Sequence, residues 1–111
     1  MAEPYLSDLK AIVAELDVPR LAGGDISCRH FFSGAAAYVG DRIFMSLSPA
    51  GLALKLPNDD RARLFDQGAQ PLRYFAKAPV KKDYAVLPAH VTDDQQVLAD
   101  WIRRSISYTR A

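Results

Sequence analysis

The chain has 111 residues, of which 50% are hydrophobic and 24% charged, and its formal net charge is +1. This is an ordinary globular composition, long enough for one hydrophobic core, and it excludes an intrinsically disordered chain. A net charge so close to zero excludes a protein that attracts nucleic acid or membranes through a global field. We therefore expect one domain over residues 1–111.

The single cysteine, Cys28, and the N-terminal sequence bear on the compartment of the protein. One cysteine excludes an internal disulfide, which fits a reducing compartment. The N-terminus lacks the basic segment and apolar core of a signal peptide. No apolar run approaches the ~20 residues that a membrane span needs. We therefore expect a cytoplasmic protein with no membrane partner.

Apolar residues recur with helical spacing near both ends of the chain. In residues 4–17 they form one stripe, and Pro19 is expected to stop this helix because proline disfavours helical geometry in the residue before it. Another helix is expected over residues 93–108, opened by a capping box of Thr92 and Gln95. The residues of these helices expected to face the core are Leu6, Leu9, Ile12, Val13, Leu16, Leu98, Trp101, Ile102, Ser105 and Tyr108.

Strand patterns and tight turns dominate residues 26–56. One long strand is expected to run from residue 26 to residue 39, with the small residues 33–37 in its middle, where a helix packs closely or the strand bulges. The turn Gly40-Asp41 leads into an expected strand over residues 42–47. The turn from Ser48 to Gly51 leads into another over residues 52–56.

The chain then continues with a short helix and two further strands. Asn58 is expected to cap the helix, which ends at Gly68 and turns Leu64 and Phe65 toward the core. The strands are expected over residues 71–76 and 83–87, with a basic turn over residues 77–82 between them.

These elements follow the order α-β-β-β-α-β-β-α. Strands in runs joined by short turns, with helices outside, predict a two-layer α+β domain with an antiparallel sheet covered by helices on one face. The other face is then solvated or covered by a second copy. Apolar strand residues on both faces favour a homodimer. These residues are Phe31, Phe32, Val39, Ile43, Met45 and Val86.

The pair Cys28 and His30 is the main pattern that suggests chemistry, because the two side chains share one face of a strand. A metal site needs two more ligands, for which only His90 and Asp93 are loose candidates, and no spacing resembles a zinc ligand set. A nucleophile–base pair needs an orienting residue and oxyanion donors, and neither is evident. We therefore predict no metal, no cofactor and no catalytic residue, with an enzyme using Cys28 and His30 as the least favoured alternative.

Basic residues between positions 73 and 84 are interspersed with aromatic ones, and this hairpin is the strongest binding candidate. Lysines at its tip suit contacts with phosphates, and the aromatic rings suit stacking on bases. In the second interpretation the hairpin is simply solvated, and its lysines protect a sheet edge from mispairing. The near-neutral charge of the whole chain favours this second interpretation.

A series of short motifs runs along residues 5–110. They are Arg29-His30-Phe31-Phe32-Ser33-Gly34, Tyr38, Gly40-Asp41, Phe44, Leu52-Ala53-Leu54-Lys55, Arg61, Gly68-Ala69-Gln70-Pro71, Tyr74, Tyr84-Ala85-Val86-Leu87-Pro88, Leu98-Ala99-Asp100-Trp101 and Ser105-Ile106-Ser107-Tyr108. In this order they resemble the N-terminal domain of the TfoX/Sxy family. The sequence departs from the family pattern where Phe31 replaces the usual Met, Ser33 replaces a Gly and the turn is Gly-Asp rather than Asp-Gly.

The resemblance implies a layout similar to type III secretion chaperones and an association with DNA uptake competence, in which longer members act as transcriptional coactivators. Those members carry a second, helical domain, so we expect this chain to be a stand-alone N-terminal module. We predict a non-enzymatic, homodimeric regulator of competence or transcription that acts through contacts with a protein partner, such as the transcription machinery. Direct nucleic-acid binding through the 73–84 hairpin is the alternative.

Three basic residues, Arg29, Lys55 and Arg61, match positions of the family pattern, and a polar cluster on the open sheet face or ion pairs with nearby aspartates would explain them equally well. Together with the hairpin they complete the set of candidate interaction residues. The set is Arg29, Lys55, Arg61, Arg73, Lys77, Lys81, Lys82 and Tyr84.

Overall fold

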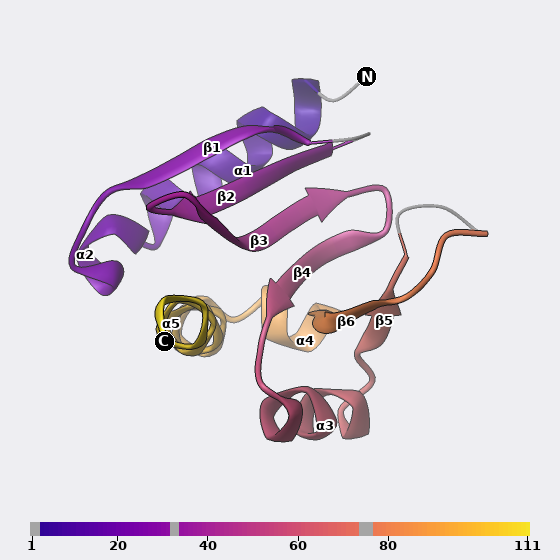
Figure 1. Ribbon diagram of the computed structural model, residues 1–111. Helices are drawn as coiled ribbons and strands as arrows, with labels where there is room; N and C mark the ends of the chain where they lie inside the picture. Colours follow the sequence, from indigo (N-terminus) through magenta and orange to yellow (C-terminus); the bar gives the residue numbers. More distant parts are fainter. Residues whose placement is uncertain (1–2, 32–33, 74–76) are drawn as a thin grey trace.

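A computed structural model describes residues 3–31, 34–73 and 77–111 of the chain (Figure 1). Its elements are α1 (Glu3–Glu15), α2 (Val18–Ala22), β1 (Ile26–Phe31), β2 (Gly34–Val39), β3 (Arg42–Ser48), β4 (Gly51–Lys55), α3 (Asn58–Asp66), β5 (Gln70–Leu72), β6 (Lys81–Val86), α4 (Ala89–Thr92) and α5 (Gln95–Arg110). The strands form one antiparallel sheet in the order β1-β2-β3-β4-β6-β5. The predicted α+β class with an antiparallel sheet is confirmed.

The long strand expected over residues 26–39 is instead a hairpin of two strands. β1 and β2 pair with each other from Ile26 opposite Val39 to Phe31 opposite Gly34. The sequence hid this reversal because strand-forming residues continue on both sides of it, and Phe32 and Ser33 lie outside the described residues. The small residues after the reversal serve close packing, as expected, and they belong to a separate strand inside the sheet.

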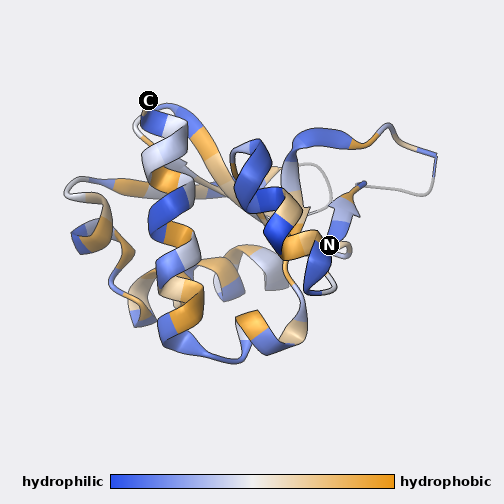
Figure 2. Ribbon diagram, turned by 90° about the horizontal axis from the view of Figure 1, so that it is seen from below, coloured by the Kyte–Doolittle hydropathy of each residue, from blue (hydrophilic) through white to orange (hydrophobic). Residues whose placement is uncertain are grey.

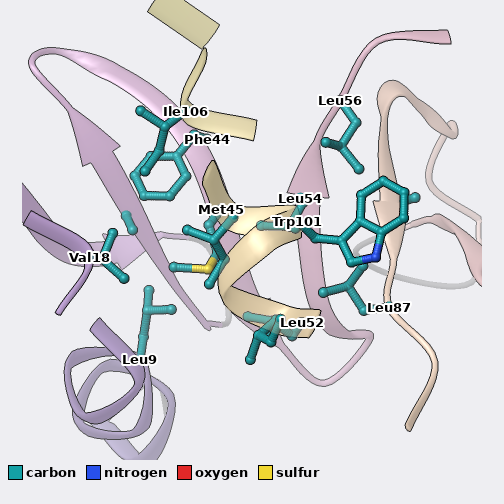
Figure 3. Close-up of a cluster of buried hydrophobic side chains, with 14 of the residues drawn as sticks. Leu9, Val18, Phe44, Met45, Leu52, Leu54, Leu56, Leu87, Trp101 and Ile106 are labelled. Atoms are coloured by element: carbon teal, nitrogen blue, oxygen red, sulfur yellow. The ribbon is translucent and has the colours of Figure 1, made fainter. Parts of the chain in front are cut away.

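The main core lies between the sheet and two helices. Helix α1 packs against β1, β2 and β3, and α5 packs against β2, β3 and β4. Figure 3 shows the core extending from Leu9 and Val18 at one end to Trp101 at the other. The helix stripes predicted from the sequence supply most of its helical side chains.

A β-bulge shapes the centre of this core. The pairing of β2 with β3 passes from Ala37 opposite Met45 to Tyr38 opposite Ile43, so Phe44 is an extra residue without a partner across the strands. Because of the bulge, Phe44 and Met45 both point into the helix-covered core, and both are fully buried.

The second face of the sheet carries a smaller apolar cluster, in which Ala53, Leu72 and Val86 are buried and Tyr84 packs against them. The small residue Ala36 on this face is also buried within the single chain. The centre of this face is therefore shielded from solvent within the single chain, without a second copy.

The helix ends differ from the expected ones at three places. Pro19 follows α1 and also lies in the first turn of α2, where proline is tolerated. The chain turns between the two helices at Asp17, whose φ angle is 52°. Helix α5 is capped by Asp94, whose side chain accepts hydrogen bonds from the backbone amides of Gln96 at 3.1 Å and Val97 at 3.2 Å. The expected cap, Thr92, ends α4 instead.

Helix α3 and the strands after it also depart from expectation in detail. Asn58 is the first helical residue rather than the cap, which is Pro57. Leu64 is buried as predicted, but Phe65 is 39% exposed and does not face the core, because the short helix turns only one narrow side toward the sheet. Strand β5 has three residues where six were expected, and positions 74–76 lie outside the described residues.

Candidate interaction surface

Exposed lysines lie on the segment that leads into β6 and on the first two residues of β6 itself, so the strand begins within the turn that was expected over residues 77–82. Figures 1 and 2 show residues 77–80 extending beyond the body of the molecule, next to β6. Lys77, Lys81 and Lys82 are all exposed. Within the described part of the chain, no ion pair engages any of the three. Their charges are therefore available to a partner, and we call these three residues the lysine patch.

Unlike the lysine patch, Arg73 already makes a hydrogen bond within the chain through its guanidinium group. Its Nη1 donates a 3.0 Å hydrogen bond to the carbonyl oxygen of Ala78. This bond joins the two arms of the hairpin near its base. Arg73 thereby helps to hold the segment that carries the lysines.

Arg61 connects helix α3 to two strands. Its Nε donates to the carbonyl oxygen of Leu56 at 3.0 Å, and its Nη2 donates to Oδ1 of Asn58 at 2.6 Å. Its Nη1 donates to the carbonyl oxygen of Lys82. The guanidinium thus fastens α3 to the ends of β4 and β6, immediately beside the lysine patch.

The sheet order separates the basic residues that the sequence suggested as one cluster. Arg29 lies on β1 and Lys55 on β4, with β2 and β3 between them, so their strands are about 14 Å apart at the usual strand spacing. The guanidinium of Arg29 lies 4.7 Å from the ring centroid of Tyr38. Lys55 lies opposite Tyr84 in the pairing of β4 with β6. They form two separate sites rather than one cluster.

A network of charges between α3 and α5 was missed at the sequence level. The carboxylate of Asp60 lies 3.8 Å from Arg63 and 3.4 Å from Arg104, and its side chain is only 13% exposed. Both guanidinium groups lie over the Trp101 ring, at 5.5 Å and 5.4 Å from its centroid. The helical spacing of Asp60 and Arg63 was a usable signal, but nothing in the sequence places Arg104 beside them.

Cys28 is half-buried at the edge of the main core. Burial raises the pKa of the Cys28 thiol, and the nearby charge of Lys10 opposes this increase with a smaller effect. A raised pKa leaves less thiolate at neutral pH, which is the opposite of what a nucleophilic cysteine needs. Across the described ranges, no group of three or more His, Cys, Asp or Glu residues is placed to hold a metal ion.

These observations define a class of protein: an α+β domain with a helix-covered antiparallel sheet and a projecting cationic segment. Residues 20–108 match the family model of the TfoX N-terminal domain, and the chain belongs to this family. A comparison with curated proteins gave no significant match. In the part of the chain that the structure describes, no helix combines the length and apolar character needed to cross a bilayer.

Proposed function

We propose that this TfoX-N module is non-enzymatic and regulates competence or transcription by binding an acidic protein surface through the lysine patch. The observation that carries the proposal is the exposure of Lys77, Lys81 and Lys82 without an ion pair in the described chain. Unpaired charges on a projecting segment attract and orient a partner of opposite charge. Membership of the TfoX N-terminal domain family supports the regulatory part of the proposal.

The surroundings of the lysine patch suit a docking site. Arg61 and Arg73 hold the segment at its base through backbone carbonyls, so less order has to be imposed when a partner binds. The exposed apolar side chain of Val80 lies between the lysines in sequence. An apolar contact with a charged rim is the usual anatomy of a protein interface.

A recruitment assay tests the proposal. The chain is fused to an unrelated DNA-binding domain upstream of a reporter gene, so that reporter expression depends on contacts with the transcription machinery. We expect the wild-type fusion to raise expression, and the double variant Lys81→Glu with Lys82→Glu to remove most of the increase. The control Arg20→Glu with Arg103→Glu changes the net charge equally at two other exposed sites. A wild-type fusion without effect, or equal losses in both double variants, would contradict the proposal.

Direct nucleic-acid binding through the same hairpin remains the second candidate, because the same lysines suit phosphates. Binding of labelled duplex DNA is measured across a salt series with wild type and the Lys81→Glu with Lys82→Glu variant. Tight binding with a steep salt dependence that the variant abolishes would replace the protein-contact proposal. Weak binding at low salt in both proteins is the result expected for a module that acts through protein contacts.

A further inference from the structure

Strand β1 forms one edge of the sheet. It has only β2 as a neighbour, and the described residues place no strand on its outer side. Three of its residues, Ser27, Arg29 and His30, are exposed. Half of the backbone amide and carbonyl groups of an edge strand point away from the sheet, and they can pair with a further strand.

An open groove of about 330 Å³ runs beside this edge, between β1 and helix α1. Its walls are mainly apolar and include Val13, Ala14 and Ile26. Lys10 on the helix contributes a positive charge to the groove wall, and Asp17, which lies beyond the end of the helix and 3.3 Å from Arg20, contributes a negative one. The groove therefore has opposite charges at Lys10 and Asp17, with the small residue Ala14 between them in sequence.

We propose that the β1 edge and this flank of α1 pair with the same surface of a second copy of the chain, around a two-fold axis perpendicular to the sheet. Such an axis makes the two β1 strands antiparallel and keeps both helix layers on the same side of a continuous sheet. Directly opposite residues must then lie on the same face of the sheet. This restriction leaves few registers for the strand pairing.

Charge selects among the allowed registers. With Ser27 opposite Ser27 of the second copy, Asp25 lies opposite Arg29 of the second copy, which joins opposite charges twice around the axis. The register that is shifted to place Arg29 opposite itself brings like charges together and is disfavoured. Asp25 and Arg29 are both exposed, so their side chains are free of the core and can meet in this way.

The helices fit the same axis. Helix α1 packs against β1, β2 and β3. Because it lies over the middle of these strands, the two α1 helices are separated by about three strand spacings, or about 14 Å, so only long side chains meet between them. In this antiparallel arrangement Lys10 faces Asp17 of the second copy, and Ala14 lies near the axis. The contact also covers the apolar walls of the groove.

Disulfide trapping tests the register. Directly opposite residues in antiparallel strands have Cα atoms about 4.5–5.5 Å apart, within the range that a disulfide bridges. We expect the variant Cys28→Ser with Ser27→Cys to form a covalent dimer under mild oxidation with oxygen and a copper catalyst. The control Cys28→Ser with Ser107→Cys places the only thiol on the exposed side of α5 and should stay monomeric on the same gel. No covalent dimer at position 27, or equal amounts in both variants, overturns the proposal.

Sedimentation equilibrium over a range of concentrations tests the helix contact without any cross-link. We expect reversible dimers for wild type and a dissociation constant raised about tenfold or more by Ala14→Glu, which places two like charges near the axis. Ala11→Glu is the matched control, since Ala11 is exposed on α1 but does not line the groove. A wild-type chain that stays monomeric, or a dimer that Ala14→Glu leaves unchanged, overturns the proposal.

Exchanging the charges of Lys10 and Asp17 tests whether the two residues meet across the dimer, because a restored dimer would not be expected if each residue only stabilised its own chain. Lys10→Glu alone should weaken the dimer by opposing Asp17 of the second copy. The double variant Lys10→Glu with Asp17→Lys should restore it, because the opposite charges are then exchanged. If the double variant dimerises no better than Lys10→Glu alone while remaining folded, the proposed antiparallel contact between the helices is wrong.

Discussion

The hydroxyl group of Ser105 donates a 2.9 Å hydrogen bond to the backbone carbonyl oxygen of Phe44, and both groups are buried. The two residues are 61 positions apart in the chain. Phe44 is the extra residue of the bulge in β3, so its backbone lacks a regular cross-strand partner. The Ser105 hydroxyl thus supplies a hydrogen-bond donor to the carbonyl group at the bulge, and the bond fixes helix α5 over the centre of the sheet.

Replacing Ser105 with alanine should lower the free energy of unfolding by about 1–3 kcal/mol, because the buried carbonyl of Phe44 loses its donor. Urea denaturation followed by circular dichroism measures the change, with an unchanged slope as the sign of a folded-state effect. Ser107→Ala removes an exposed hydroxyl from the same helix and should alter stability by no more than about 0.5 kcal/mol. Equal stability of the two variants would show that the bond contributes nothing.

Gly34→Ala should destabilise the fold by about 3 kcal/mol or prevent folding, because an added Cβ would clash with the carbonyl oxygen of Leu47 and lie 2.8 Å from Cα of Ser48. These contacts are with backbone atoms of β3, which cannot rotate away. Gly24→Ala is the control, since nothing lies within 4 Å of its added Cβ. The comparison uses the urea midpoint of each variant. A Gly34→Ala protein as stable as Gly24→Ala would contradict the close approach of β2 and β3.

The sequence predicted well those features that depend on local chemistry. The turn at Gly40 and Asp41 and the alternation of residues 52–56 each follow from the spacing of a few residues, and the structure has both. The apolar stripe of α5 is confirmed in part, because Tyr108 is only half-buried while Ile106 and Thr109 are buried. The β1–β2 reversal was missed because no Asn-Gly or Asp-Gly pair marks a turn between the two strands. The exposed side of Phe65 was missed because the sequence does not define which side of a short helix meets the sheet.

The candidate surface was only partly predictable for a related reason. The exposure of the lysine patch follows from the hydrophilic sequence around it, although Lys81 and Lys82 begin strand β6 instead of lying in the expected turn. The commitments of Arg61 and Arg73 to backbone carbonyls depend on distances between separate elements, as does the stacking of Arg104 on Trp101. A basic residue has the same appearance in a sequence whether its charge is available or already used, so contacts across the fold decide this point.

Arg61→Gln should destabilise the protein by about 1–2 kcal/mol, because the shorter side chain cannot reach both the Leu56 and Lys82 carbonyl oxygens. Hydrogen exchange should show the largest loss of protection in α3 and at the start of β6, which Arg61 joins. Arg103→Gln removes the same charge from an exposed ion pair with Asp100 and should cost less than about 0.5 kcal/mol. Uniform loss of protection across the sheet would argue against a local role for Arg61.

The Cys28 thiol should react more slowly with iodoacetamide at neutral pH than a thiol in an unfolded chain. Burial raises the pKa of this thiol, so less of the reactive thiolate is present, and the reaction rate should rise with pH to a midpoint above that of the unfolded chain. The rate of carboxamidomethylation is measured from neutral to alkaline pH, with and without denaturant. A fast reaction at neutral pH in the folded protein would contradict this prediction and favour an enzymatic role for Cys28.

The same pKa shift predicts the pH dependence of stability. The folded chain holds the Cys28 proton to higher pH than the unfolded chain does, so the stabilising contribution is fully present below the unfolded pKa and is lost as pH rises through the folded pKa. Stability should therefore fall on the alkaline side, and Cys28→Ala should reduce this fall. Urea denaturation of both proteins at neutral and alkaline pH measures the difference. An equal loss of stability at alkaline pH in wild type and Cys28→Ala would assign the effect to other groups, since alanine has no proton to release.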